Sequence, residues 1–137
     1  MNVSPQTMSQ QVAEAARAFQ HRQTGHSPQA VTVVLSNDTL VVTLHQALSP
    51  AEVALSQTPD GAVKVQQYHR QLFESSADLL RKEIRRITGV KVREAAVEVE
   101  STTGAVVHAF TSGRMVQVFR LESLISAESW SGPGNGN

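Results

Sequence analysis

The stretch "AVTVVLSNDTLVVTLH", residues 30–45, carries the strongest fold signal of the chain. Two runs rich in β-branched residues flank the pair Asn37 and Asp38. Both residue types tolerate the backbone conformations of a two-residue turn, and β-branched side chains favour strands. The stretch therefore predicts an antiparallel β-hairpin over about residues 30–46.

A helix is predicted before this hairpin. Apolar residues recur at helical spacing over about residues 7–22, which indicates one buried face. Gly25 is the expected C-terminal cap of that helix, and Pro28 prevents the helix from continuing. The apolar residues that define the face are Met8, Val12, Ala16 and Phe19.

Two helices are predicted after the hairpin. Ser49, Pro50 and Glu52 form a capping-box start with proline at the first helical position, so a short helix should cover about residues 50–57. A long helix should follow over about residues 60–88 and end at Gly89. Its expected buried stripe consists of Phe73, Ala77, Leu80, Ile84 and Ile87, widened in the first half by Val65, Tyr68 and Leu72.

Three strands are predicted in the last part of the chain. The apolar alternation that begins at Val90 changes phase before Ala95, which indicates a β-bulge near Glu94. Turn-like segments then separate two further apolar runs, residues 105–111 and 115–121. Strands that come in groups rather than singly between helices favour an antiparallel sheet.

These elements predict an α+β fold in the order α-β-β-α-α-β-β-β. The sheet should be mostly antiparallel, with about five strands and with the one long helix packed on it. A single domain should cover residues 1–125, because no linker divides the chain. The segment 126–137, rich in glycine and asparagine toward its end, is expected to be a disordered tail.

Composition limits the classes of function. The chain has 137 residues, no cysteine, and 12 basic against 12 acidic residues, so thiolate chemistry and cysteine-based zinc sites are excluded. No apolar run approaches the ~18 residues that cross a bilayer, and the N-terminus lacks a signal-peptide pattern. We therefore expect a cytoplasmic protein without a transmembrane segment, whose membrane association, if it has one, is peripheral and through a partner.

Basic residues cluster in "RKEIRRITGVKVR", residues 81–93. One interpretation is a solvated helix end whose cations complement the helix dipole, with Asp78 pairing to Arg81 and Lys82. The other is an interaction surface for an acidic partner. Nucleic acid is the less favoured partner, because no aromatic residue interleaves the cations. The candidate surface consists of Arg81, Lys82, Arg85, Arg86, Lys91 and Arg93.

Motifs of catalysis are absent from the sequence. There is no nucleophile elbow, and neither phosphate-binding glycine pattern occurs. The histidines lack the spacing typical of zinc ligands, and Glu98 with Glu100 gives no sign of a dry site. No catalytic, cofactor-binding or metal-binding residue is predicted, although a small enzyme or ligand-binding domain remains a third hypothesis. The five histidines are His21, His26, His45, His69 and His108.

The order of these motifs resembles the MpsC-like family of small bacterial domains. The resemblance covers roughly residues 8–121 and rests on Gly25 with Pro28, the hairpin 31–45, "LSPAE" at 48–52 and "TGVKV" at 88–92. Ser27 stands where a second glycine is usual. The family name implies an accessory link to membrane proteins that transport sodium or take up inorganic carbon. The resemblance implies no catalytic residues.

The sequence thus favours a non-enzymatic accessory or regulatory domain that acts by protein–protein contact. We expect a homodimer or another homo-oligomer, with a membrane transporter subunit as a partner. The alternative is a nucleic-acid-binding regulatory module that uses the basic segment Arg81–Arg93.

Overall fold

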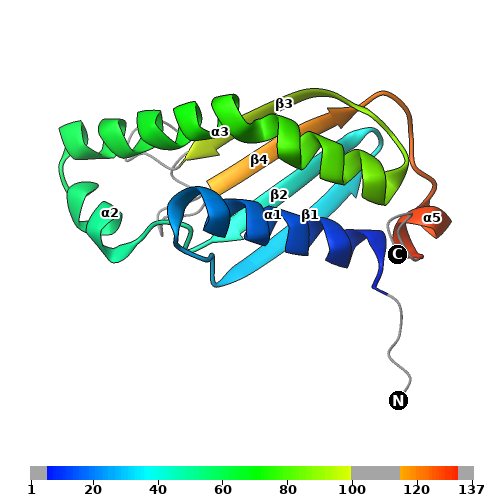
Figure 1. Cartoon of the computed structure of the whole chain (residues 1–137), viewed down its shortest axis with the longest axis horizontal. Helices are drawn as coiled ribbons and strands as arrows, with labels where there is room; N and C mark the ends of the chain where they lie inside the picture. Colours follow the sequence, from blue (N-terminus) through cyan, green and yellow to red (C-terminus); the bar gives the residue numbers. More distant parts are fainter. Residues whose placement is uncertain (1–5, 100–114, 133–137) are drawn as a thin grey trace, which may run out of the picture.

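The computed structural model describes residues 6–99 and 115–132. Within them the chain forms a mixed α and β fold with a four-stranded antiparallel sheet (Figure 1). In chain order the elements are α1 (Met8–Thr24), β1 (Ala30–Ser36), β2 (Thr39–His45), α2 (Pro50–Leu55), α3 (Pro59–Thr88), β3 (Val92–Val99), β4 (Met115–Leu121) and α5 (Ala127–Ser131).

The strand order is β1-β2-β4-β3, and every neighbouring pair is antiparallel. Because β2 and β3 are both antiparallel to β4, they run parallel to each other. Helices α2 and α3 form the crossover between them, as Figure 1 shows. This connection places the two ends of α3 at opposite ends of the sheet.

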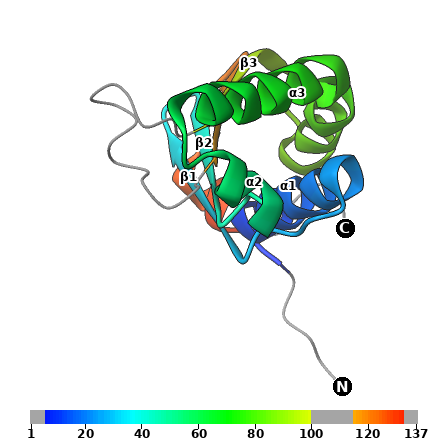
Figure 2. The same ribbon diagram turned by 90° about the vertical axis from the view of Figure 1, so that its left-hand side faces the viewer.

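One face of the sheet carries the helices α1 and α3, which pack against each other as well as on the strands (Figure 2). Side chains alternate along β2 and β4 between this buried face and the opposite face. Phe73 of α3 lies at the centre of the core, with its ring 6.4 Å from Phe19 and 5.9 Å from Phe119. The core therefore joins both helices to the sheet.

The predicted helix ends are confirmed. Ser49 and Glu52 form a capping box at the start of α2. Gly25 and Gly89 end α1 and α3 in the left-handed conformation, both with φ of 76°. Glycine suits this conformation because it has no Cβ to clash with the backbone. All five residues of the predicted α3 stripe are also buried.

The strand predictions are confirmed where the structure describes them. Strands β1 and β2 form the hairpin, and Asn37 in its turn has a positive φ of 55°. The register of β3 against β4 shifts between Val92 and Glu94, where the bulge was predicted. The described sheet has four strands rather than about five, and the predicted strand over 105–111 lies outside the described residues.

Three expectations need correction. The sheet face carries α1 beside α3, not one helix alone. Tyr68 is exposed rather than part of the buried stripe, because a turn of 100° per residue places His69 on the stripe instead. Residues 127–131, expected in a disordered tail, form α5, whose start Ser126 caps and which contacts α1.

Candidate functional site

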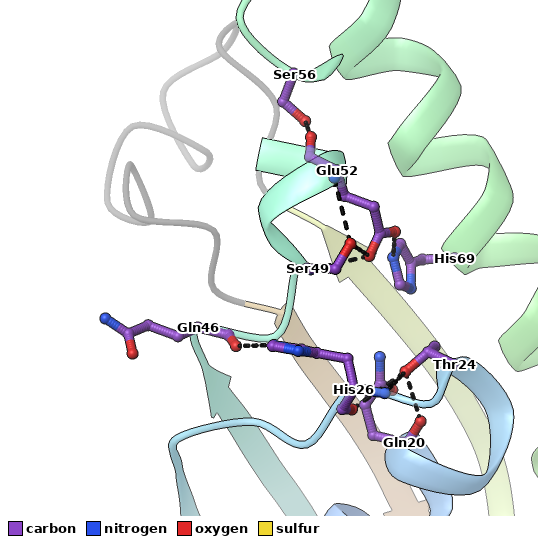
Figure 3. A network of polar contacts seen from close by, with 8 residues as sticks. All are labelled: Gln20, Thr24, His26, Gln46, Ser49, Glu52, Ser56 and His69. Carbon is purple, nitrogen blue, oxygen red and sulfur yellow. Dashed lines mark hydrogen bonds and ion pairs between the residues drawn. The ribbon is translucent and has the colours of Figure 1, made fainter. Parts of the chain in front are cut away.

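The end of α1, the start of α2 and the first half of α3 meet at one end of the sheet. Figure 3 shows the polar side chains that gather there, and we call this region the polar junction. Its centre is Glu52 on α2 with His69 on α3, and its border is formed by Gln20 and Thr24 of α1. All four histidines within the described residues belong to this end or to the helix, strand and loop that lead into it: His21, His26, His45 and His69.

Glu52 links α2 to α3. Its Oε2 lies 2.5 Å from Nε2 of His69, whose side chain is buried. Its Oε1 accepts hydrogen bonds from the backbone N–H and the hydroxyl of Ser49, both at 3.0 Å. The same carboxylate therefore caps the six-residue helix α2 and partners a buried histidine.

The surroundings of Glu52 favour its charged form. Partial burial by itself would raise the pKa of this carboxyl, because burial disfavours charge. The hydrogen bond from the Ser49 backbone, the attraction of His69 and the side-chain hydrogen bonds outweigh burial, so the pKa of Glu52 is below its usual value. The polar junction thus holds an ionised carboxylate next to an imidazole.

Close backbone approach fixes α2 against α3. A Cβ placed on Gly61 would lie 1.8 Å from the carbonyl oxygen of Leu55 and 3.0 Å from Oγ1 of Thr58. Any side chain at this position would push the two helices apart. Thr58 meanwhile caps α3 by accepting a hydrogen bond from the Gly61 N–H at 3.1 Å. The tight turn between the helices is therefore what keeps Glu52 within reach of His69.

A second set of contacts joins the two loops that enter the junction. Nε2 of His26, which follows α1, lies 3.0 Å from the carbonyl oxygen of Gln46, which follows β2 (Figure 3). Gln46 has a φ of 54°, uncommon for a residue with a side chain. The Thr24 hydroxyl donates to the Gln20 carbonyl at 2.8 Å, and the buried Nε2 of Gln20 has no hydrogen-bond partner. Both loops contain segments on which the family resemblance rests.

A pocket of about 300 Å³ opens onto the junction. Its lining combines Glu52, Lys64 and the half-exposed Tyr68 with apolar residues. Both oxygens of Glu52 already have partners, and no described group of histidines and carboxylates could hold a metal ion. The contacts of the polar junction hold α2 against α3. The pocket is lined by Thr24, Ser49, Glu52, Leu55, Lys64, Val65 and Tyr68.

The structure places the predicted basic surface at the other end of α3. Arg81 is half-buried, while Lys82, Arg85, Lys91 and Arg93 are exposed. In the described part of the chain, no ion pair engages any of these five side chains. Arg85 belongs to the last turn of α3, where a cation complements the helix dipole.

Arg86, the sixth residue of the predicted surface, differs from the other five. Its guanidinium lies 2.8 Å from the Glu83 carboxylate, and this hydrogen bond lowers the pKa of Glu83 and raises that of Arg86. Arg22 of α1 also favours the charged form of Glu83. The predicted pairing of Asp78 with Arg81 and Lys82 is wrong for the described residues, and Glu83 provides the helical ion pair instead.

The polar junction was not predicted as a site. The capping box was recognised from Ser49 and Glu52, but nothing in the local sequence connects them to a residue 17 positions later. One signal was present: His69 precedes Phe73 of the buried stripe by four residues, which places a polar side chain on a buried face.

Comparison with known proteins agrees with the motif order. The family model described as "Na+-translocating membrane potential-generating system (MpsC)" matches residues 4–114. The uncharacterized protein YbcI of Bacillus subtilis (strain 168) is 26% identical over 110 residues, which cover 80% of this chain and 89% of that protein. No solved structure matches. None of the described helices is long and apolar enough to cross a membrane. With most of its length matched by the family model, the chain belongs to the MpsC family.

Proposed function

We propose that this protein is a non-enzymatic accessory or regulatory domain of a sodium-translocating, membrane-potential-generating system. The family description supports the association with such a system. We further propose that the domain lies in the cytoplasm and reaches the membrane only through a protein partner. The arrangement of Ser49, Glu52 and His69 supports a non-enzymatic role, because each of these groups is engaged in holding the helices together.

The cations at the C-terminal end of α3 that form no ion pair within residues 6–99 and 115–132 support the proposal of protein contact. Arg81, Lys82 and Arg85 lie on the last turns of the helix, and Lys91 with Arg93 continues into β3. Charge that is partnered within the fold stabilises the fold, whereas exposed charge without a partner is available to another molecule. These five residues form the docking surface, and its partner should present acidic side chains.

An acidic protein surface fits these cations better than nucleic acid does. The chain as a whole has a formal net charge of zero, whereas nucleic-acid-binding domains usually carry a basic excess. Tyr68, the half-exposed aromatic residue of α3, lies more than about three helical turns from Arg81, too far to stack a base beside it.

Co-sedimentation with membranes tests the proposal. We expect the purified protein to sediment with membranes from its native host and not with protein-free vesicles of the same lipids. The double variant Arg85→Glu/Lys91→Glu should weaken this binding at least tenfold, because two attractive charges become repulsive. Arg17→Glu/Lys64→Glu is the matched control, with the same change in net charge away from the docking surface.

Three outcomes contradict the proposal. Equal binding to the protein-free vesicles would indicate a lipid partner. Equal loss of binding in the two double variants would indicate an effect of net charge alone. Absence of membrane binding, together with salt-sensitive binding of duplex DNA that Arg85→Glu/Lys91→Glu abolishes, would favour the nucleic-acid alternative.

A further inference from the structure

An apolar seam runs along the exposed side of α3. Tyr68 and Leu79 are each 49% exposed, and Leu72 between them is half-buried. Residues 68, 72, 75 and 79 recur at intervals of four, three and four, which places them in one line on a helix. We call Tyr68, Leu72, Ser75 and Leu79 the α3 seam. Leu55 extends its N-terminal end, since it lines the same pocket as Tyr68.

The position of the α3 seam distinguishes it from the core stripe. At about 100° per residue the seam positions lie on a different side of α3 from Phe73, and the next step along the line is Glu83, which pairs with Arg86. Other exposed hydrophobic residues, such as Val34 on β1 and Leu124 before α5, do not form a line with the seam. A line of half-exposed leucine and tyrosine side chains, interrupted only by the small Ser75, is typical of a helix-packing surface.

We infer that the α3 seam pairs with the α3 seam of a second copy of this chain, with the two helices antiparallel. A two-fold axis between residues 75 and 76 would place Leu72 of each copy opposite Leu79 of the other. The small side chain of Ser75, whose hydroxyl already bonds to the Gln71 carbonyl, lies at the crossing point. Small residues at a crossing allow helices to approach closely, while the four leucines supply the buried apolar area.

The two ends of the α3 seam carry groups that attract each other, with Tyr68 at one end and charged residues at the other. The same axis places Tyr68 opposite position 83 of the second copy, between Lys82 and Arg86. A cation beside a tyrosine ring is attracted by the ring's negative face, and the tyrosine hydroxyl can donate to the Glu83 carboxylate. In a parallel arrangement Lys82 and Arg86 would face their own copies and repel. The antiparallel pairing is therefore the one that this seam favours.

The oligomeric state in solution tests the pairing. Sedimentation equilibrium over a range of concentrations should show a dimer for the parent chain. Leu79→Lys should raise the dimer dissociation constant at least tenfold, because it places two charges in the apolar centre. Val34→Lys is the matched control, an exposed apolar residue of β1 outside the seam, and should leave the constant unchanged.

Site-directed cross-linking tests the orientation independently. The chain has no cysteine, so each single-cysteine variant contains one thiol. Under mild oxidation Ser75→Cys should form a covalent dimer, since the two-fold axis brings the two positions together. Asp60→Cys should not, because antiparallel helices separate the two copies of residue 60 by roughly 45 Å.

The results separate the alternatives. A monomer at all concentrations, or a dimer that dissociates equally in Leu79→Lys and Val34→Lys, would overturn the inference. Cross-linking of Asp60→Cys with none at Ser75→Cys would overturn the antiparallel arrangement. Lys82 lies beside the α3 seam as well as on the docking surface, but neither cysteine substitution changes a docking-surface residue, so failure of the proposed membrane contact would leave this inference standing.

Discussion

The two ends of α3 use charge in opposite ways. At its N-terminal half, Glu52 and His69 face each other inside the polar junction, and each side chain is shielded by the helices that it joins. At its C-terminal end, Arg85 and Lys91 are exposed, and in the described part of the chain they form no ion pair. The N-terminal half of α3 thus contributes His69 to a hydrogen-bonded pair with Glu52 of α2, whereas the C-terminal end of α3 carries exposed cations.

Substitutions at the two ends of α3 should affect different properties of the protein. A buried pair is costly to break, because removal of one partner leaves the other buried without a hydrogen bond and without access to water. An exposed cation contributes little to stability, so its removal should leave the fold intact. Substitutions at the two ends should therefore separate stability from partner binding, and the following predictions begin with the largest expected effect.

Loss of the Glu52 carboxylate should give the largest effect. Glu52→Ala removes the partner of His69 and half of the capping box of α2, and should lower the free energy of unfolding by about 3 kcal/mol. Urea denaturation followed by circular dichroism at fixed protein concentration measures the change. Glu74→Ala, an exposed glutamate on α3, is the control and should change stability by less than about 0.5 kcal/mol. Equal effects of the two substitutions would contradict a structural role for the junction.

A side chain at Gly61 should disturb the junction without touching its polar groups. Gly61→Ala places a methyl group against the Leu55 carbonyl and should cost about 2 kcal/mol. The same denaturation experiment measures this loss. Combining Gly61→Ala with Glu52→Ala should cost less than the sum of the two, because both weaken the contact between α2 and α3. Strict additivity would show that the turn does not position Glu52.

Acidification should weaken the polar junction before it affects the cationic end of α3. The folded-state pKa of Glu52 is lowered, so its contribution to stability is fully present above the usual pKa of about 4.3 and is lost as the pH falls through the lowered value. Between about pH 5 and pH 3, the unfolding free energy of the parent chain should fall more steeply than that of Glu52→Gln. Parallel curves for the two proteins would contradict an ionised Glu52 in the folded state.

Reversal of a cation at the other end should have the smallest effect on stability. Arg85→Glu places a negative charge in the last turn of α3 and should destabilise the fold by about 0.5 kcal/mol through the helix dipole. Thermal unfolding in low salt measures the change, which should shrink when salt is added. A loss as large as that of Glu52→Ala would show that this end, too, is part of the structural framework.

Much of the fold was predictable because its signals are local. The hairpin around Asn37, the capping box at Ser49 and the glycine that ends α3 each depend on residues within a few positions of one another. The bulge near Glu94 was visible as a change of phase in a single strand. The exposure of Tyr68 was missed because a residue at the border of a helical stripe can face either way until its neighbours are placed.

The helices and strands of the described residues, their order and the basic end of α3 follow from the local sequence, since they depend on periodicity and on caps. The position of β4 between β2 and β3, and of α1 beside α3 on the sheet face, depends on long-range packing. The contact of Glu52 with His69 across 17 residues of chain depends on it too. Such contacts form when separate elements bury their apolar faces together, and local propensity contains no information about which elements will meet.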